Sequence, residues 1–250
     1  MISPKIASVI ERRLLVNYRV EPEVAARLLP AGMRPQLVGG RAVAGICLLR
    51  LGDTRPRWAP AGTGVRSENA AHRISVEWDG PDGVEAGVWI PRRDSGSRLN
   101  VLAGGRLFPG AHGSAAFEVR ETPREVGVAY ATKDGSTRVR VEARVTDELR
   151  GSRLFGDLAQ ASEFFRQGDR GYSPARVEGR LDGMQLHTRA WRVEATEVTR
   201  AESSFFEDPE RFPPGTAQFD CALLMRDVPV EWHPLDSAAA ATAGCAAPAA

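Results

Sequence analysis

Short, closely spaced strand-like segments separated by tight turns restrict the fold of this 250-residue chain most strongly. Apolar residues alternate or run together in segments at 34–38, 41–50, 114–121, 125–132 and 137–146. Gly39-Gly40 joins the first two segments as a two-residue hairpin, and Lys133-Asp134-Gly135 turns the chain between the last two. Because strands joined by tight turns pair antiparallel, this pattern predicts a mostly antiparallel sheet of barrel or sandwich form.

Helical periodicity is confined to a few short segments, so the predicted fold class is α+β. Glu21-Pro22 begins a short helix with proline in its first turn. Apolar residues at helical spacing from Leu154 to Gln167, followed by Gly168 as C-cap, predict the longest helix. We expect residues 1–236 to form a single domain, because no repeat or linker divides them, and the Ala-rich tail 237–250 to be disordered.

The stretch from Gly87 to Ser97 is the predicted centre of the functional site. A strand from Glu85 to Ile90 is expected to end at Pro91 and to lead into Arg92-Arg93-Asp94. Asp94 is the predicted N-cap of a short helix over 97–102. Free N–H groups at a helix N-terminus and two guanidiniums favour a bound anion, most simply a carboxylate.

Composition excludes several classes of protein. An apolar content of 42% and a charged content of 26% are typical of globular proteins, and a net charge of +1 gives no field that would attract nucleic acid or an anionic membrane. No apolar run is long enough to span a bilayer. The three cysteines are widely separated, which favours a reduced, cytoplasmic environment. The histidines show no metal-binding spacing, so we predict no metal and no cofactor. The sequence is compatible with a homo-oligomer.

Several segments, taken in order, resemble the acetoacetate decarboxylase-like superfamily. The segment Arg12 to Pro30 is similar to the strand and short helix that open such chains, and Ser67 to Gly80 to the strand that carries a pocket glutamate. Ile90-Pro91-Arg92-Arg93 lies where the decarboxylases have an aromatic residue, proline and two lysines. Stretches around Phe164-Phe165, Gly171-Tyr172-Ser173 and Ala222 to Arg226 resemble an uncharacterised bacterial branch alone. The resemblance covers residues 10–232 in pieces and implies the decarboxylase-like fold.

The resemblance also shows where the decarboxylase mechanism is missing. In the decarboxylases the second lysine forms a Schiff base, but both positions are arginine here, and a guanidinium does not form imines. The chain has only two lysines, Lys5 near the N-terminus and Lys133 in a turn. We therefore expect the fold without the Schiff-base chemistry.

Two functional hypotheses follow. In the first, an enzyme of the lyase, isomerase or cyclase type acts on a small carboxylate or keto acid. Its predicted catalytic residues are Glu68, Arg93 and His112, with Arg12, Arg92, Asp94 and Arg106 as substrate-binding residues. Here one arginine holds the anion while Glu68 and His112 move a proton. The second hypothesis is a non-catalytic protein that binds a small anionic ligand on the same fold.

Several of these residues also have a structural interpretation, and for His112 it is that of a structural or solvated loop histidine. Arg92 and Arg93 would be tied to Asp94 and surface glutamates, and Glu68 to Arg66 or Arg73. Because adjacent residues on a strand point in opposite directions, at most one of the two arginines is expected to face a pocket.

Overall fold

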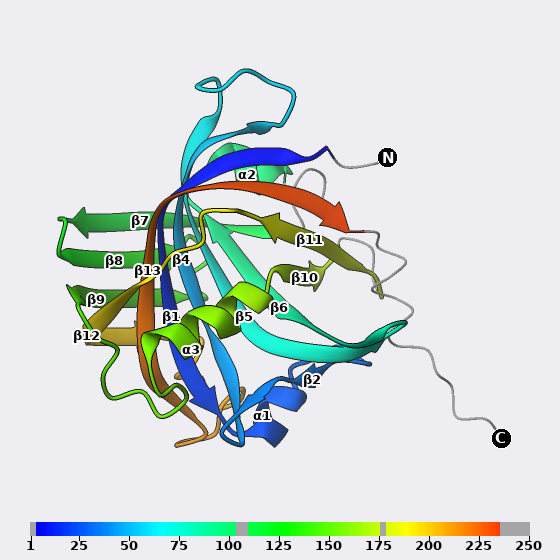
Figure 1. Ribbon diagram of the computed structural model, residues 1–250, viewed down its shortest axis with the longest axis vertical. Helices are drawn as coiled ribbons and strands as arrows, with labels where there is room; N and C mark the ends of the chain where they lie inside the picture. Colours follow the sequence, from blue (N-terminus) through cyan, green and yellow to red (C-terminus); the bar gives the residue numbers. More distant parts are fainter. Residues whose placement is uncertain (1–3, 104–109, 176–178, 236–250) are drawn as a thin grey trace.

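The structure is a computed structural model that describes residues 4–103, 110–175 and 179–235. Within these ranges the chain forms thirteen strands in one sheet, together with three short helices (Figure 1). The helices are α1 (Pro22–Ala26), α2 (Arg98–Ala103) and α3 (Leu158–Gln167). The strands are β1 (Ile6–Val20), β2 (Arg34–Pro35), β3 (Leu37–Val38), β4 (Arg41–Pro56), β5 (Val65–Gly80), β6 (Gly83–Ser95), β7 (His112–Glu121), β8 (Glu125–Thr132), β9 (Arg138–Thr146), β10 (Arg170–Pro174), β11 (Leu181–His187), β12 (Glu194–Ser203) and β13 (Ala217–Leu235).

Strand pairing closes this sheet into two rings that share β13, β1, β4, β5 and β6. Strands β10 and β11 complete the first, which we call the seven-strand ring. Strands β7, β8, β9 and β12 complete the second, which we call the nine-strand ring. The pairings are antiparallel except for those of β6 with β7 and with β10. The predicted mostly antiparallel, barrel-like α+β fold is confirmed.

The central parts of β1, β4, β5 and β13 are buried on both faces because each face meets a different core. Leu14, Leu15 and Val16 are consecutive residues of β1, and all three are fully buried. Leu14 and Val16 pack into a core that reaches β7, β8 and β9, whereas Leu15 packs into a core beneath α3. Figure 1 shows α3 lying across these shared strands. Membership in both rings therefore removes the alternation of buried and exposed residues that a one-sided strand would show.

The end of β6 differs from the sequence prediction. The strand continues through Pro91 to Ser95, so Asp94 is a strand residue and its prediction as a helix N-cap is wrong. Pro91 is tolerated because the pairing of β5 with β6 shifts register beside it, between His72 and Ile74, where no ladder hydrogen bond is required. The hydroxyl of Ser97 instead accepts a hydrogen bond from the backbone N–H of Asn100, at 3.3 Å, and caps α2.

The longest described helix starts later than predicted. Asp157 is the N-cap of α3 and accepts a 2.7 Å hydrogen bond from the N–H of Gln160, so helical structure begins at Leu158. Leu154 and Phe155 precede the helix and pack into the core beneath it. Gly168 is the C-cap, as predicted. No helix of the described ranges is both long and apolar enough to span a bilayer. The predicted tail 237–250 and Arg106 lie outside the described residues.

Candidate functional site

A cavity of about 120 Å³ lies inside the seven-strand ring. Each strand of this ring contributes to its wall, and α3 adds Phe165. The charged and polar wall includes Arg13, Arg73, Arg93, Cys47 and His112. Among the described residues, no group of three or more His, Cys, Asp or Glu side chains is placed so that it could hold a metal ion.

Strand register explains why these side chains share one cavity. Leu15, Cys47, Ala71, Arg93 and His112 are cross-strand partners in a single row over five neighbouring strands. Side chains that lie opposite one another in a row project to the same face of a sheet. Residues two positions away on the same strand share that face as well, which brings Arg13 and Arg73 to the cavity.

None of the three cavity arginines forms an ion pair within 4.0 Å in the part of the chain that the structure describes, although the charge of Asp182 acts on Arg93, and Asp94 and Asp169 also line the cavity. Arg93 Nε donates to Ser173 Oγ at 2.9 Å. Arg73 Nε donates to Cys47 Sγ at 3.2 Å, and Arg13 Nη2 lies 3.5 Å from the same sulfur. The Arg73 guanidinium is also 4.7 Å from the centroid of the Phe165 ring. Because enclosing unpaired charge is costly, three neighbouring guanidiniums create a strong preference for an anion.

The enclosed position of these groups changes how they titrate. Burial lowers the pKa of Arg93 to about 10, which leaves the guanidinium protonated at neutral pH. Burial and the charge of Arg93 lower the pKa of His112 to about 4, so this imidazole is neutral there. Burial raises the pKa of the Cys47 thiol, but the charges and N–H groups of Arg13 and Arg73 outweigh burial, and the net pKa lies below its ordinary value.

Glu68 lies elsewhere, in an ion-pair cluster with Arg12. Its carboxylate accepts hydrogen bonds from Arg12 Nη2 at 2.5 Å and from Arg50 Nε at 2.6 Å, and it does not line the cavity. Glu121 completes the cluster, 3.1 Å from Arg50 and 3.7 Å from Arg12. The predicted group of Glu68, Arg93 and His112 is therefore divided: the structure brings Arg93 and His112 together and places Glu68 with Arg12.

Arg92 points away from the cavity, as expected for the neighbour of Arg93. It donates to the carboxylate of Asp94, with Nε 2.9 Å from Oδ2, and to Ser136 Oγ at 2.9 Å. Asp94 is fully buried, borders the cavity, and also accepts a hydrogen bond from the Tyr130 hydroxyl at 3.4 Å. Arg92 and Asp94 therefore satisfy each other, which agrees with their structural interpretation.

Sequence reasoning missed Arg13, Arg73 and Cys47. Arg13 directly follows the charged residues Glu11 and Arg12, Arg73 lies between His72 and Ile74, and Cys47 lies in a continuous apolar segment. The three residues share a face only through the pairing of β1 with β4 and of β4 with β5, which no local pattern reveals.

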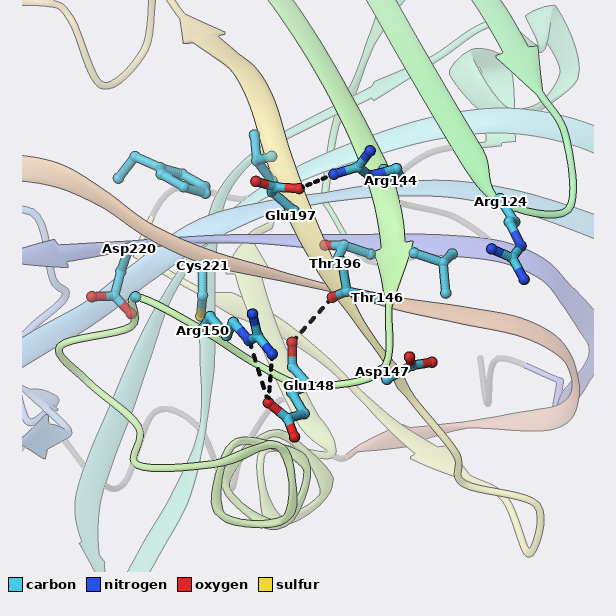
Figure 2. Close-up of a pocket in the computed structure, with 14 residues that line it drawn as sticks. Arg124, Arg144, Thr146, Asp147, Glu148, Arg150, Thr196, Glu197, Asp220 and Cys221 are labelled. Atoms are coloured by element: carbon cyan, nitrogen blue, oxygen red, sulfur yellow. Dashed lines mark hydrogen bonds and ion pairs between the residues drawn. The ribbon is translucent and has the colours of Figure 1, made fainter.

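A second, wider depression lies between β9, β12 and the beginning of β13, with a volume of about 880 Å³. Figure 2 shows two pairs of its charged side chains turned toward one another, Arg144 with Glu197 and Arg150 with Glu148. These pairs are at 2.5 Å and 3.1 Å, and their side chains are more than half exposed. Exposed, mutually paired charges have little need of a ligand, so the smaller cavity is the better candidate site.

The family of uncharacterized conserved proteins designated DUF2071 matches residues 9–226, and the chain belongs to this family. No curated protein sequence matches the chain.

Solved structures share the fold at low sequence identity. An acetoacetate decarboxylase-like enzyme from Sphingomonas wittichii RW1 has a TM-score of 0.60 at 15% identity, over 95% of each chain. The acetoacetate decarboxylase from Legionella pneumophila has a TM-score of 0.58 at 9% identity, over 93% of this chain and 86% of that one. The enduracididine biosynthesis enzyme MppR in complex with pyruvate has a TM-score of 0.56 at 12% identity, over 95% of this chain and 92% of that one. The chain thus has the acetoacetate decarboxylase-like fold.

Proposed function

We propose that the cavity of the seven-strand ring binds a small carboxylate or keto acid. The observation that supports this proposal most directly is the group of Arg13, Arg73 and Arg93. These guanidiniums form no ion pair with a carboxylate among the described residues. A carboxylate would accept charge-assisted hydrogen bonds from guanidinium N–H groups in this enclosed space. The pyruvate bound by MppR, a protein of the same fold, supports a keto acid as the ligand class.

Binding in this cavity would be electrostatic and would not use a Schiff base. Both Lys5 and Lys133 are exposed, and neither lines the cavity. An imine requires an unprotonated amine next to the bound carbonyl, and arginine cannot provide one.

A second candidate function is catalysis on the same ligand, of the lyase, isomerase or cyclase type. The observation that favours it is the neutral imidazole of His112 in the row beside Arg93. A neutral imidazole can accept a proton from a substrate whose new negative charge is stabilised by arginine. Glu68 is not part of this proposal, because Arg12 and Arg50 hold its carboxylate outside the cavity.

Titration calorimetry with pyruvate and acetoacetate tests the binding proposal, with neutral acetone as a chemical control. We expect both acids to bind and acetone not to bind. Arg93→Gln should weaken binding by at least about tenfold, the scale of one lost charge-assisted contact. Arg144→Gln, in the wider depression, should bind like the unmodified protein. Equal affinities in Arg93→Gln and Arg144→Gln would exclude the cavity as the binding site.

Following the bound acids by proton NMR separates the two candidates. Exchange of the α-protons with solvent deuterium, lost in His112→Phe, would support catalysis. Binding of the acids without proton exchange or product formation would support the non-catalytic, ligand-binding function.

A further inference from the structure

The sulfur of Cys47 lies between two guanidiniums in the cavity wall. Arg73 Nε is 3.2 Å from Sγ and Arg13 Nη2 is 3.5 Å from it. Both groups are donors only, so their preferred partner is an anionic sulfur rather than a neutral thiol. The cross-strand neighbours of Cys47 are Leu15 and Ala71, neither of which is charged. Within the described residues, the contacts of this sulfur therefore favour its thiolate form.

Arg73 gives an independent indication that something enters this space. Its side chain is in the cavity wall and the residue is only 2% exposed, yet its Nη1 atom has no hydrogen-bond partner in the described part of the protein. A buried guanidinium N–H without an acceptor is costly, and an anion in the cavity would satisfy it. The same guanidinium thus contacts Cys47 through Nε and has a free donor for a ligand.

The second described cysteine provides an internal comparison. Cys221 is also buried under α3, but it follows Asp220 and accepts its hydrogen bond from the amide of Asn17 at 3.6 Å. Burial and the neighbouring carboxylate raise the pKa of Cys221 to about 12, so this thiol stays protonated. The two cysteines thus have opposite electrostatic environments within one apolar core.

From this geometry we infer that Cys47 is a nucleophile toward small anionic electrophiles that enter the cavity, with carboxylates that carry an electrophilic carbon as the chemical class. This rests on the proposed anion binding, since Arg13 and Arg73 would both activate the sulfur and hold the incoming carboxylate. The pKa of Cys47, lowered by those arginines against the effect of burial, agrees with the geometry.

The chemistry needs no partner beyond solvent. With a 2-oxo acid, the sulfur electron pair forms a bond to the keto carbon, and the π pair moves to oxygen. That oxygen takes a proton from water, which gives a hemithioketal and hydroxide. With iodoacetate as a probe, the sulfur–carbon bond forms while the carbon–iodine bond breaks, and iodide leaves with the electron pair.

Alkylation of the full chain carrying Cys245→Ser tests the inference, with each cysteine followed by peptide mass spectrometry. At about pH 6, we expect iodoacetamide to label Cys47 at least about tenfold faster than it labels N-acetylcysteine, while Cys221 remains unlabelled. We also expect a preference for the charged reagent: the ratio of iodoacetate to iodoacetamide rates at Cys47 should exceed that of N-acetylcysteine by about tenfold. Pyruvate should slow both reactions.

Variants of the cavity arginines test both the thiolate form of Cys47 and the anion-binding cavity. Arg13→Gln should reduce both the iodoacetamide rate and the iodoacetate preference at Cys47, whereas Arg144→Gln should change neither. Arg73→Gln serves as a second variant if Arg13→Gln does not fold, as judged by circular dichroism. Slow labelling of Cys47 by iodoacetamide in the folded protein overturns the thiolate. Fast labelling without any preference for iodoacetate overturns the anion-binding cavity instead, and with it the proposed function.

Discussion

Two arginine groups lie on opposite faces of the same strands and differ in one respect. Arg12 faces the nine-strand ring, where Glu68 and Glu121 lie within 4.0 Å of it. Arg13, the next residue, faces the seven-strand ring, where its described polar contact is the sulfur of Cys47. The first group balances its charges internally and serves the fold. The second does not, and this imbalance is what a ligand would correct.

The largest expected effect comes from breaking the balanced group. Arg12→Met removes a fully buried guanidinium and leaves Glu68 and Glu121 with fewer partners, so we expect a loss of about 3 kcal/mol or more in the free energy of unfolding. Urea unfolding monitored by circular dichroism measures this loss. A change below about 0.5 kcal/mol would mean that the cluster does not stabilise the fold.

On β5, His72 is the buried neighbour of Arg73, and its environment predicts a pH dependence of stability. Burial, with the charges of Arg92 and Arg211, lowers the pKa of His72 to about 3 in the folded protein, against an ordinary value of 6.5. Between these values the unfolded state binds more protons than the folded state. The contribution of neutral His72 to the free energy of unfolding is therefore fully present above about pH 6.5, and it decreases as the pH falls toward 3.

At about pH 5 we expect the protein to be about 2 kcal/mol less stable than at about pH 7 through His72 alone. His72→Leu should remove most of that difference, whereas the exposed His187→Leu should not. Urea unfolding at the two pH values measures it. An unchanged pH dependence in His72→Leu would assign the acid sensitivity to other groups.

Substitution by methionine, which should destabilise the protein at Arg12, should not destabilise it at the neighbouring Arg13. Arg13→Met removes a charge without a carboxylate partner, so stability without ligand should stay the same or rise by up to about 1 kcal/mol. The affinity for pyruvate should fall about tenfold in calorimetry. If Arg13→Met destabilises as strongly as Arg12→Met, the two groups do not differ in the way proposed.

Reductive trapping of an imine is the one treatment for which we expect no effect. Borohydride added with acetoacetate should leave the mass of the protein unchanged, because Lys5 and Lys133 are exposed amines outside the cavity. Intact mass spectrometry detects a trapped adduct. An adduct at Lys133 would show that imine chemistry is available to this chain.

Local signals predicted a large part of this fold. Gly39-Gly40 forms the predicted hairpin because both residues have positive φ, 57° and 77°, which glycine adopts without strain. Strands β7, β8 and β9 follow their alternating residues closely. Pro91 misled the prediction because the register shift that accommodates it depends on pairing with β5, which no local pattern reveals.

The candidate site was less accessible to such reasoning. Arg93 and His112 lie in or near a recognisable sequence motif, and the structure places both at the cavity. Arg13 and Arg73 reach it only through the register of β1, β4 and β5, and a slip of one residue would turn either side chain into the other ring. Glu68 was linked to the site by resemblance alone, and its actual partners, Arg12 and Arg50, follow from tertiary structure.

The sharing of strands by two rings has a consequence for how this sequence can vary. In β8 the residues alternate between buried and more exposed, so every second position can accept many side chains. In the middle of β1 five consecutive residues are buried, because each faces one of two interiors. A saturation mutagenesis scan should therefore show a tolerance of period two along β8 and an uninterrupted intolerant block from Leu14 to Tyr18. Divergence should concentrate in the strands that belong to one ring only.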